Sequence, residues 1–110
     1  GFIGMDIETA VREKIPVLTI LLNNQTMGIY SPSSFPTAND LYGTKSTGGD
    51  YAMVAQALGG YNERVVQPSE VAPAIRRAQE VISNGQPALL EIMTSEEHAF
   101  PFRGAVGGAR

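Results

Sequence analysis

The chain has 110 residues, of which 43% are hydrophobic and 17% are charged, and its formal net charge is −3. This length allows one domain with a modest core, and the acidic balance provides no basic patch for nucleic acid or anionic lipid. The absence of cysteine excludes a disulfide framework and a zinc–thiolate site. The longest apolar run, residues 17–22, is far shorter than the ~18 residues of a membrane span. We therefore expect a soluble protein of the reducing cytoplasm.

The first third of the chain predicts a helix followed by a buried strand. Apolar residues recur at helical spacing within residues 5–14, and Pro16 ends that helix because the residue before a proline avoids the α region. Residues 17–22 are apolar on both faces, as in a parallel strand covered by helices on each side. We expect this strand to be the most buried one, with parallel neighbours on both sides in the intact domain.

A second helix and strand are predicted in the middle of the chain. The helix covers about residues 51–58, with Asp50 as its N-cap and Gly59 and Gly60 as its stop. A short strand follows at about residues 64–67.

A third helix and strand complete the pattern. Ser69 is a suitable N-cap for a helix with one apolar stripe, and Gly85 ends that helix in the left-handed conformation. The last strand is Ala88–Met93.

This order of elements predicts an α/β fold, a three-layer, doubly wound parallel sheet with right-handed crossovers. Three strands leave a long apolar sheet edge open, which intact proteins avoid. We therefore expect an incomplete sheet whose missing strands precede Gly1 or lie on partner chains, and the lack of an initiator Met points the same way. Residues 1–98 form the domain, and the glycine-rich residues 99–110 are expected to be a flexible tail.

Residues 30–49 interrupt the alternation of helices and strands, because they show no period of 2 or 3.6. The segment leaves the carboxyl end of a buried strand, which is where open α/β sheets bind ligands. We expect a lid-like loop that becomes ordered when the site is occupied. The alternatives are a tolerated insertion and a compact Ω-loop packed through Phe35 and Leu41.

The chemistry is concentrated in the string Asn23-Asn24-Gln25-Thr26-Met27-Gly28. Taken alone, two asparagines after a strand most often form a turn. The string follows Leu21-Leu22 and precedes Ile29, and it stands downstream of Met5-Asp6-Ile7-Glu8-Thr9-Ala10-Val11-Arg12. Together, these segments resemble the second half of the thiamine diphosphate-binding motif of the acetolactate synthase, benzaldehyde lyase and oxalyl-CoA decarboxylase superfamily. In that superfamily Gly-Asp-Gly opens the motif, and Asn-Asn closes it after one helix and one strand. The resemblance runs from Gly1 to about Pro101.

The resemblance implies a role for five residues. The side-chain amide oxygen of Asn24 and the backbone carbonyl of Thr26 would coordinate Mg²⁺, a hard cation that prefers oxygen ligands. Together with Gly28, they would form the part of the thiamine diphosphate site that this chain provides. Ile29 falls where family members line the substrate pocket, and Tyr30 is a second candidate for the same wall. No catalytic acid or base is assigned to this chain.

The resemblance further implies a thiamine diphosphate- and Mg²⁺-dependent parent enzyme, a lyase or transferase that decarboxylates or ligates 2-oxo acids or acyl-CoA. The Gly-Asp-Gly is absent, and its Asp would fall a few residues before Gly1. The domain whose Glu activates the aminopyrimidine is also absent, and by analogy it comes from a neighbouring subunit of a homo-oligomer. We therefore expect this chain to be inactive alone. The substrate and the presence of FAD are determined outside this segment.

Two other classes of protein stay open at this point. A stand-alone flavodoxin-like domain could hold a phosphate ligand at the same strand end, but it would need a glycine-rich loop that opens a helix. A non-catalytic interaction module could use the open sheet edge for assembly. A Gly-Asp-Gly encoded upstream of Gly1 would favour the enzyme over both.

Overall fold

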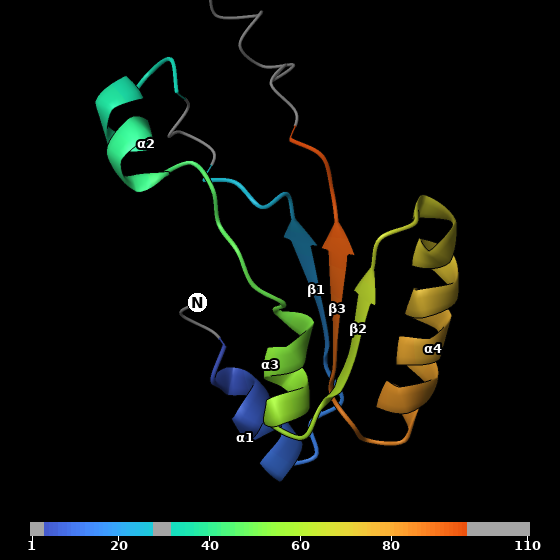
Figure 1. Cartoon of the computed structure of the whole chain (residues 1–110). Coiled ribbons are helices and arrows are strands. Elements are labelled where there is room, and N and C mark those ends of the chain that lie inside the picture. The colour runs from blue at the N-terminus through green and yellow to red at the C-terminus, as the bar shows by residue number, and fades with distance from the viewer. Residues whose placement is uncertain (1–3, 28–31, 97–110) are drawn as a thin grey trace, which may run out of the picture.

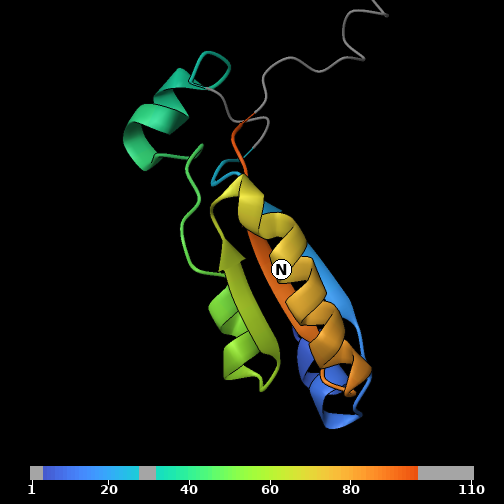
Figure 2. The same ribbon diagram turned by 90° about the vertical axis from the view of Figure 1, so that its right-hand side faces the viewer.

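A computed structural model describes residues 4–27 and 32–96 of the chain. Three strands form one parallel sheet in the spatial order β1-β3-β2. The strands are β1 (Leu18–Asn23), β2 (Tyr61–Val65) and β3 (Ala88–Met93). The helices are α1 (Asp6–Arg12), α2 (Pro36–Tyr42), α3 (Ala52–Ala57), the 3₁₀ helix η1 (Pro68–Glu70) and α4 (Val71–Ser83). Helices α1 and α3 cover one face of the sheet and α4 covers the other (Figures 1 and 2), which confirms the predicted α/β fold with a three-layer parallel sheet.

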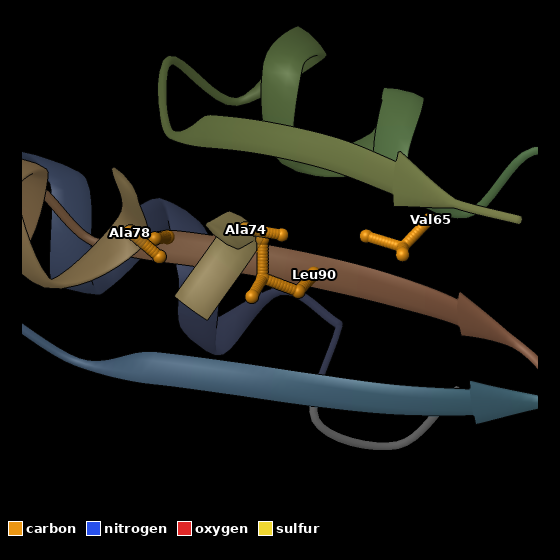
Figure 3. Close-up of a cluster of buried hydrophobic side chains, with 5 residues drawn as sticks. Val65, Ala74, Ala78 and Leu90 are labelled. Carbon is orange, nitrogen blue, oxygen red and sulfur yellow. The ribbon is translucent and has the colours of Figure 1, made fainter. Parts of the chain in front are cut away.

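The core is centred on β3, whose side chains alternate between the two faces of the sheet. On one face, Leu90 packs in a buried cluster with alanines of α4 (Figure 3). On the other face, Leu89 packs against Ala52 and Ala55 of α3. Because alanine is small, both helices lie close to the strand.

Within this chain, the position of β1 differs from the one predicted for residues 17–22 in the intact domain. Within the described chain β1 is an edge strand, since it pairs only with β3, whereas β3 pairs on both sides. Ile20 is 46% exposed and Leu22 is 67% exposed, although both are apolar. The most buried strand of this chain is therefore β3, and a second neighbour for β1 in a larger sheet stays a prediction.

Two predicted helix starts have different outcomes. Asp50 Oδ1 accepts the backbone N–H of Met53 at 3.4 Å, which is the contact expected of an N-cap. The prediction that Ser69 caps the third helix is wrong, because no side chain caps η1 or α4. Pro68 explains the difference, since its fixed φ favours the first position of a helical turn, and η1 leads directly into α4.

The glycine stops are confirmed, and the strand after the second helix begins earlier than predicted. Gly59 and Gly85 have φ values of 89° and 85°, the left-handed conformation that ends helices. The strand predicted at residues 64–67 is β2, which begins earlier, at Tyr61. It begins there because Tyr61 N–H already donates to the Pro87 carbonyl next to β3, at 2.9 Å.

The segment predicted as a structureless loop contains a helix, α2. Pro36 stands in its first turn, and Gly43 follows its end with φ 57°, an arrangement that favours helix formation at both termini. The helix buries no residue, and Phe35 and Leu41 are 45% and 67% exposed. The Ω-loop packed through these two side chains is therefore not what the structure shows. Whether the segment acts as a lid stays a prediction.

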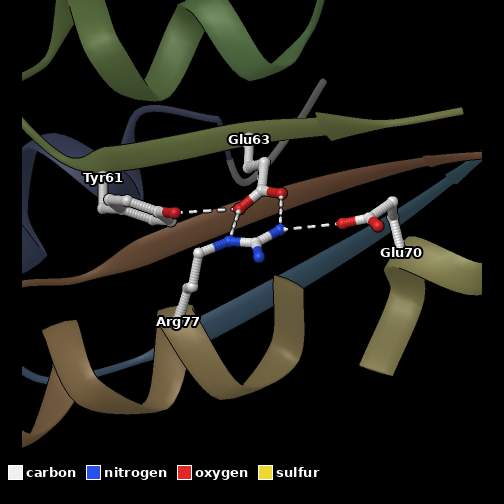
Figure 4. A network of polar contacts seen from close by, with 4 residues as sticks. All are labelled: Tyr61, Glu63, Glu70 and Arg77. Atoms are coloured by element: carbon white, nitrogen blue, oxygen red, sulfur yellow. Dashed lines mark hydrogen bonds and ion pairs between the residues drawn. The ribbon is translucent and has the colours of Figure 1, made fainter. Parts of the chain in front are cut away.

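A polar network joins β2 to α4 (Figure 4). Arg77 Nε donates to Glu63 Oε2 at 3.1 Å, and Tyr61 Oη donates to the same oxygen at 2.8 Å. Arg77 also lies 3.5 Å from a carboxylate oxygen of Glu70. The hydrogen bond from Arg77 is the main cause that lowers the pKa of Glu63, whereas burial is the main cause that raises the pKa of Tyr61.

Replacing Leu90 by Ala should lower the free energy of unfolding of the chain by about 2–5 kcal/mol, because the side chain is fully buried. Ile20→Ala is the matched control and should cost clearly less, since Ile20 is half-exposed at the edge strand. Urea denaturation followed by circular dichroism measures both values. Equal costs would contradict the burial described for β1 and β3.

Glu63→Gln should flatten the acid limb of the stability curve. The folded-state pKa of Glu63 lies below the ordinary value of 4.5, so the stabilisation is present above that value and is lost as the pH falls through the lowered pKa. The expected result is a smaller loss of stability below about pH 5 than in the unaltered chain, together with lower stability at neutral pH. Arg77→Gln should flatten the same limb, because this guanidinium lowers the pKa of Glu63. An unchanged pH dependence in Arg77→Gln would contradict the assignment.

Candidate functional site

The chain makes a tight turn directly after β1. Asn23 Oδ1 accepts the N–H of Gln25 at 2.8 Å, and Asn24 Oδ1 accepts the N–H of Thr26 at 3.0 Å. Gln25 has φ 57°, a left-handed conformation that costs a non-glycine residue about 1–2 kcal/mol. The two asparagines thus stabilise a turn that strand geometry alone would not favour, as the general preference of Asn-Asn for turns predicts.

The two asparagine side chains have different surroundings. Asn23 is 7% exposed, and its Nδ2 donates to Glu91 Oε1 in the central strand at 2.6 Å. Asn24 is only partly buried, and the contact found for its amide oxygen is the local one to Thr26. A carbonyl oxygen has a second lone pair, so Asn24 Oδ1 can still bind a cation.

The segment that follows α2 returns to this turn and pairs with it. Met27 N–H donates to the Lys45 carbonyl at 2.7 Å, and Thr47 N–H donates to the Gln25 carbonyl at 2.9 Å. Thr26 and Ser46 form an antiparallel bridge between these two bonds. Part of the predicted lid is therefore fixed to the motif by backbone hydrogen bonds.

The strand end of β3 completes the arrangement. Thr94 N–H donates to the Asn23 carbonyl at 2.9 Å. Lys45 Nζ lies 2.8 Å from Glu96 Oε2, and both side chains are 21% exposed. Residues 23–27, 44–47 and 94–96 thus meet at the carboxyl end of the sheet, above the arrowheads of β1 and β3 in Figure 1.

The oxygen atoms of the turn are suitable ligands for a hard cation. Asn24 Oδ1 and the Thr26 backbone carbonyl are neutral oxygen donors, and the buried hydroxyl of Thr26 has no hydrogen-bond partner among the described residues. In the part of the chain that the structure describes, no three His, Cys, Asp or Glu side chains are grouped as a metal site. Mg²⁺ would fit this turn if its charge were balanced by other anionic groups, such as a diphosphate and a carboxylate.

Three of the predicted site residues cannot be compared with the structure. Gly28, Ile29 and Tyr30 lie outside the described residues.

Sequence reasoning assigned no role to Glu91, which the structure places beside the turn. Glu91 is 0% exposed, and its other oxygen accepts the N–H of Ala52 at the start of α3 at 3.0 Å. The signal was present in the sequence, because a charged residue inside an otherwise apolar strand is rarely buried without partners.

A separate cavity of about 620 Å³ lies between α1, α3 and the edge strand β1. Its described lining is largely apolar and includes Ile7, Val54 and Leu89, with Asp6 as the charged residue. It contains neither Asn24 nor Thr26, so it is distinct from the polar turn. None of the described helices is long and apolar enough to cross a membrane.

Comparison with known proteins agrees with the motif. Residues 1–92 match the family described as thiamine pyrophosphate enzyme, C-terminal TPP binding domain; thiamine pyrophosphate (TPP) is another name for thiamine diphosphate. The chain is 35% identical over 108 residues to the acetolactate synthase large subunit IlvG of Mycobacterium tuberculosis, covering 94% of this chain and 18% of that protein.

Two further relatives show similar coverage. The protein YdaP of Bacillus subtilis is 30% identical over 110 residues, covering 100% of this chain and 19% of YdaP. The sulfoacetaldehyde acetyltransferase of Alcaligenes xylosoxydans is 28% identical over 109 residues, covering 94% of this chain and 17% of that protein. The chain therefore spans less than a fifth of the length of these relatives.

Proposed function

The chain belongs to the family of thiamine pyrophosphate enzymes, as their C-terminal TPP-binding domain, and we propose that it provides the magnesium-binding turn of a longer enzyme. In this proposal, Asn24 Oδ1 and the Thr26 carbonyl hold Mg²⁺, and the metal fixes the diphosphate of the cofactor at the carboxyl end of β1. Gly28 belongs to the same cofactor site, and Ile29 and Tyr30 line the substrate pocket. The observation that supports the proposal is the turn itself, in which Asn23 is buried against Glu91 while Asn24 is only partly buried.

The residues of this chain would bind and orient the cofactor and would not move protons. When bound, thiamine diphosphate supplies the electron sink for decarboxylation or carboligation. Residues 45–47, which are hydrogen-bonded to the turn, would form one fixed wall beside the proposed metal ligands. Closure of the rest of the predicted lid over the cofactor would exclude water from the reacting carbon.

We propose a 2-oxo acid or an acyl-CoA as the substrate of the longer enzyme, with acetolactate synthase-like chemistry. Two relatives are named as an acetolactate synthase subunit and an acetyltransferase, which supports a reaction of the transferase or lyase kind. We further propose that the longer enzyme is a cytoplasmic homo-oligomer in which a neighbouring subunit completes the site. The family membership favours this proposal over a stand-alone flavodoxin-like module.

In the longer enzyme, Asn24→Ala should lower the affinity for Mg²⁺ in the presence of thiamine diphosphate, with a stability loss of only about 0.5–1.5 kcal/mol for one local hydrogen bond. Asn23→Ala should lower stability more, because it leaves the buried Glu91 without one donor, and it should weaken Mg²⁺ binding less than Asn24→Ala, because it removes no metal ligand. Titration with Mg²⁺ and urea denaturation of both variants separate the two effects. Equal Mg²⁺ dependence in the two variants would show that Asn24 is not the ligand.

The chain of 110 residues should bind thiamine diphosphate and Mg²⁺ only weakly by itself. Its described residues provide neutral oxygen donors without a carboxylate cluster, so the charges of metal and diphosphate are poorly balanced. Isothermal titration calorimetry of the chain and of the longer enzyme measures the difference. Micromolar affinity of the chain alone would refute this expectation.

A further inference from the structure

Glu91 is a buried acidic side chain at the centre of the sheet, and the proposed metal chemistry does not use it directly. It lies in β3 with 0% exposure, among the apolar neighbours Leu89, Leu90 and Ile92. Moving a carboxylate from water into such a place is costly unless hydrogen bonds replace its hydration. A leucine would fill the position without that cost, so the carboxylate calls for a different explanation.

Each oxygen of Glu91 accepts a hydrogen bond from a different element. Oε1 accepts from Asn23 Nδ2 at 2.6 Å, and Oε2 accepts from the Ala52 N–H at 3.0 Å. Asn23 is the last residue of β1, and Ala52 is the first residue of α3. The side chain of Glu91 thus links the central strand to the turn after β1 through one oxygen and to the start of α3 through the other.

The contact to Asn23 also fixes the orientation of its amide group. Since Nδ2 donates to Glu91, Oδ1 must point the other way, and there it accepts the N–H of Gln25 at 2.8 Å. This second bond supports Gln25 in its left-handed conformation, which turns the chain so that Asn24 and Thr26 follow as neighbours. The hydrogen bonds therefore run from the central strand through Asn23 to Gln25, the residue between the two proposed metal ligands, Asn24 and Thr26.

We propose that Glu91 is a positioning residue of the cofactor site, which acts through Asn23 to hold the Asn24–Thr26 turn in its metal-binding form. This inference rests on the proposed function, because it assumes that the turn binds Mg²⁺. Groups that hydrogen-bond to the immediate surroundings of a metal orient its ligands, and their loss typically lowers metal affinity by roughly 10–100-fold.

The test uses the longer enzyme with thiamine diphosphate, and it measures Mn²⁺ binding by electron paramagnetic resonance, in which free Mn²⁺ is counted without any assay of activity. Glu91→Gln keeps the shape of the side chain but faces two donors with only one oxygen. We expect it to weaken Mn²⁺ binding by about tenfold or more. Leu90→Ala, which lies on the opposite face of the same strand, is the control that loses stability and should leave Mn²⁺ binding little changed.

An exchange variant isolates the hydrogen bond. The variant combines Asn23→Asp with Glu91→Gln. The new carboxylate at position 23 can accept two hydrogen bonds, one from the N–H of Gln25 and one from the new amide nitrogen at position 91. The amide oxygen at position 91 can still accept the N–H of Ala52. This double variant should fold and should regain most of the Mn²⁺ affinity, even where Glu91→Gln alone fails to fold.

Unchanged Mn²⁺ binding in Glu91→Gln would overturn the positioning role, as would an exchange variant that neither folds nor binds better than the single variant. A loss of the same size in Leu90→Ala would also overturn it, because the effect would then follow stability alone. Failure of the unaltered enzyme to bind Mn²⁺ with thiamine diphosphate is a different result, which would overturn the proposed function itself.

Discussion

The carboxylate of Glu91 lies where three parts of the fold meet, namely the central strand, the end of β1 and the beginning of α3. Its two hydrogen bonds, from Asn23 and from Ala52, replace the water that a buried carboxylate loses. Removing either donor would leave part of that charge uncompensated, so the strand end and the helix start are bound to the same central point. This contact orients the turn after β1, because the amide nitrogen of Asn23 donates to Glu91 while the amide oxygen accepts the N–H of Gln25.

The different surroundings of Asn23 and Asn24 follow from that arrangement. Successive residues at the end of a strand point to opposite sides, so the burial of Asn23 leaves Asn24 as the one that can face a ligand. The wall formed by residues 45–47 then pairs with the turn through backbone bonds, which do not depend on the identity of its side chains. The proposed cofactor site can therefore tolerate sequence change in residues 45–47 while the turn and its contact to Glu91 stay the same.

Much of the fold could be predicted from local patterns. The strand Ala88–Met93 and the glycine stops could be predicted because a largely apolar run and helix-ending glycines are local signals. The strand order could not be predicted that way, since residues 17–22 look as buried as β3 in sequence and only pairing distinguishes an edge strand from a central one. Helix α2 was missed because it has no apolar stripe, although its Pro36 and Gly43 are typical of a short helix.

The candidate site could be predicted only in part, because only its local residues carry a signal in the sequence. The Asn-Asn string, together with its flanking residues and the upstream segment 5–12, carries the resemblance to the family, so Asn24 and Thr26 could be proposed as metal ligands from sequence. The partners of the turn are distant in sequence: Glu91 lies 68 residues after Asn23, and its contact with Asn23 depends on two strands being neighbours in space. The positions of Glu91 and Lys45 near the turn can therefore be recognised only when the sheet register and the path of the chain after α2 are known.

The central claim is that the turn after β1 holds the metal that anchors the cofactor. The most direct measurement is a crystal structure of the longer enzyme with thiamine diphosphate and Mn²⁺, in which anomalous scattering locates the metal independently of any assumed ligand. The claim predicts the anomalous peak within about 2–2.5 Å of Asn24 Oδ1 and of the Thr26 carbonyl oxygen. A peak coordinated by Asn23, or one remote from residues 23–27, would contradict it.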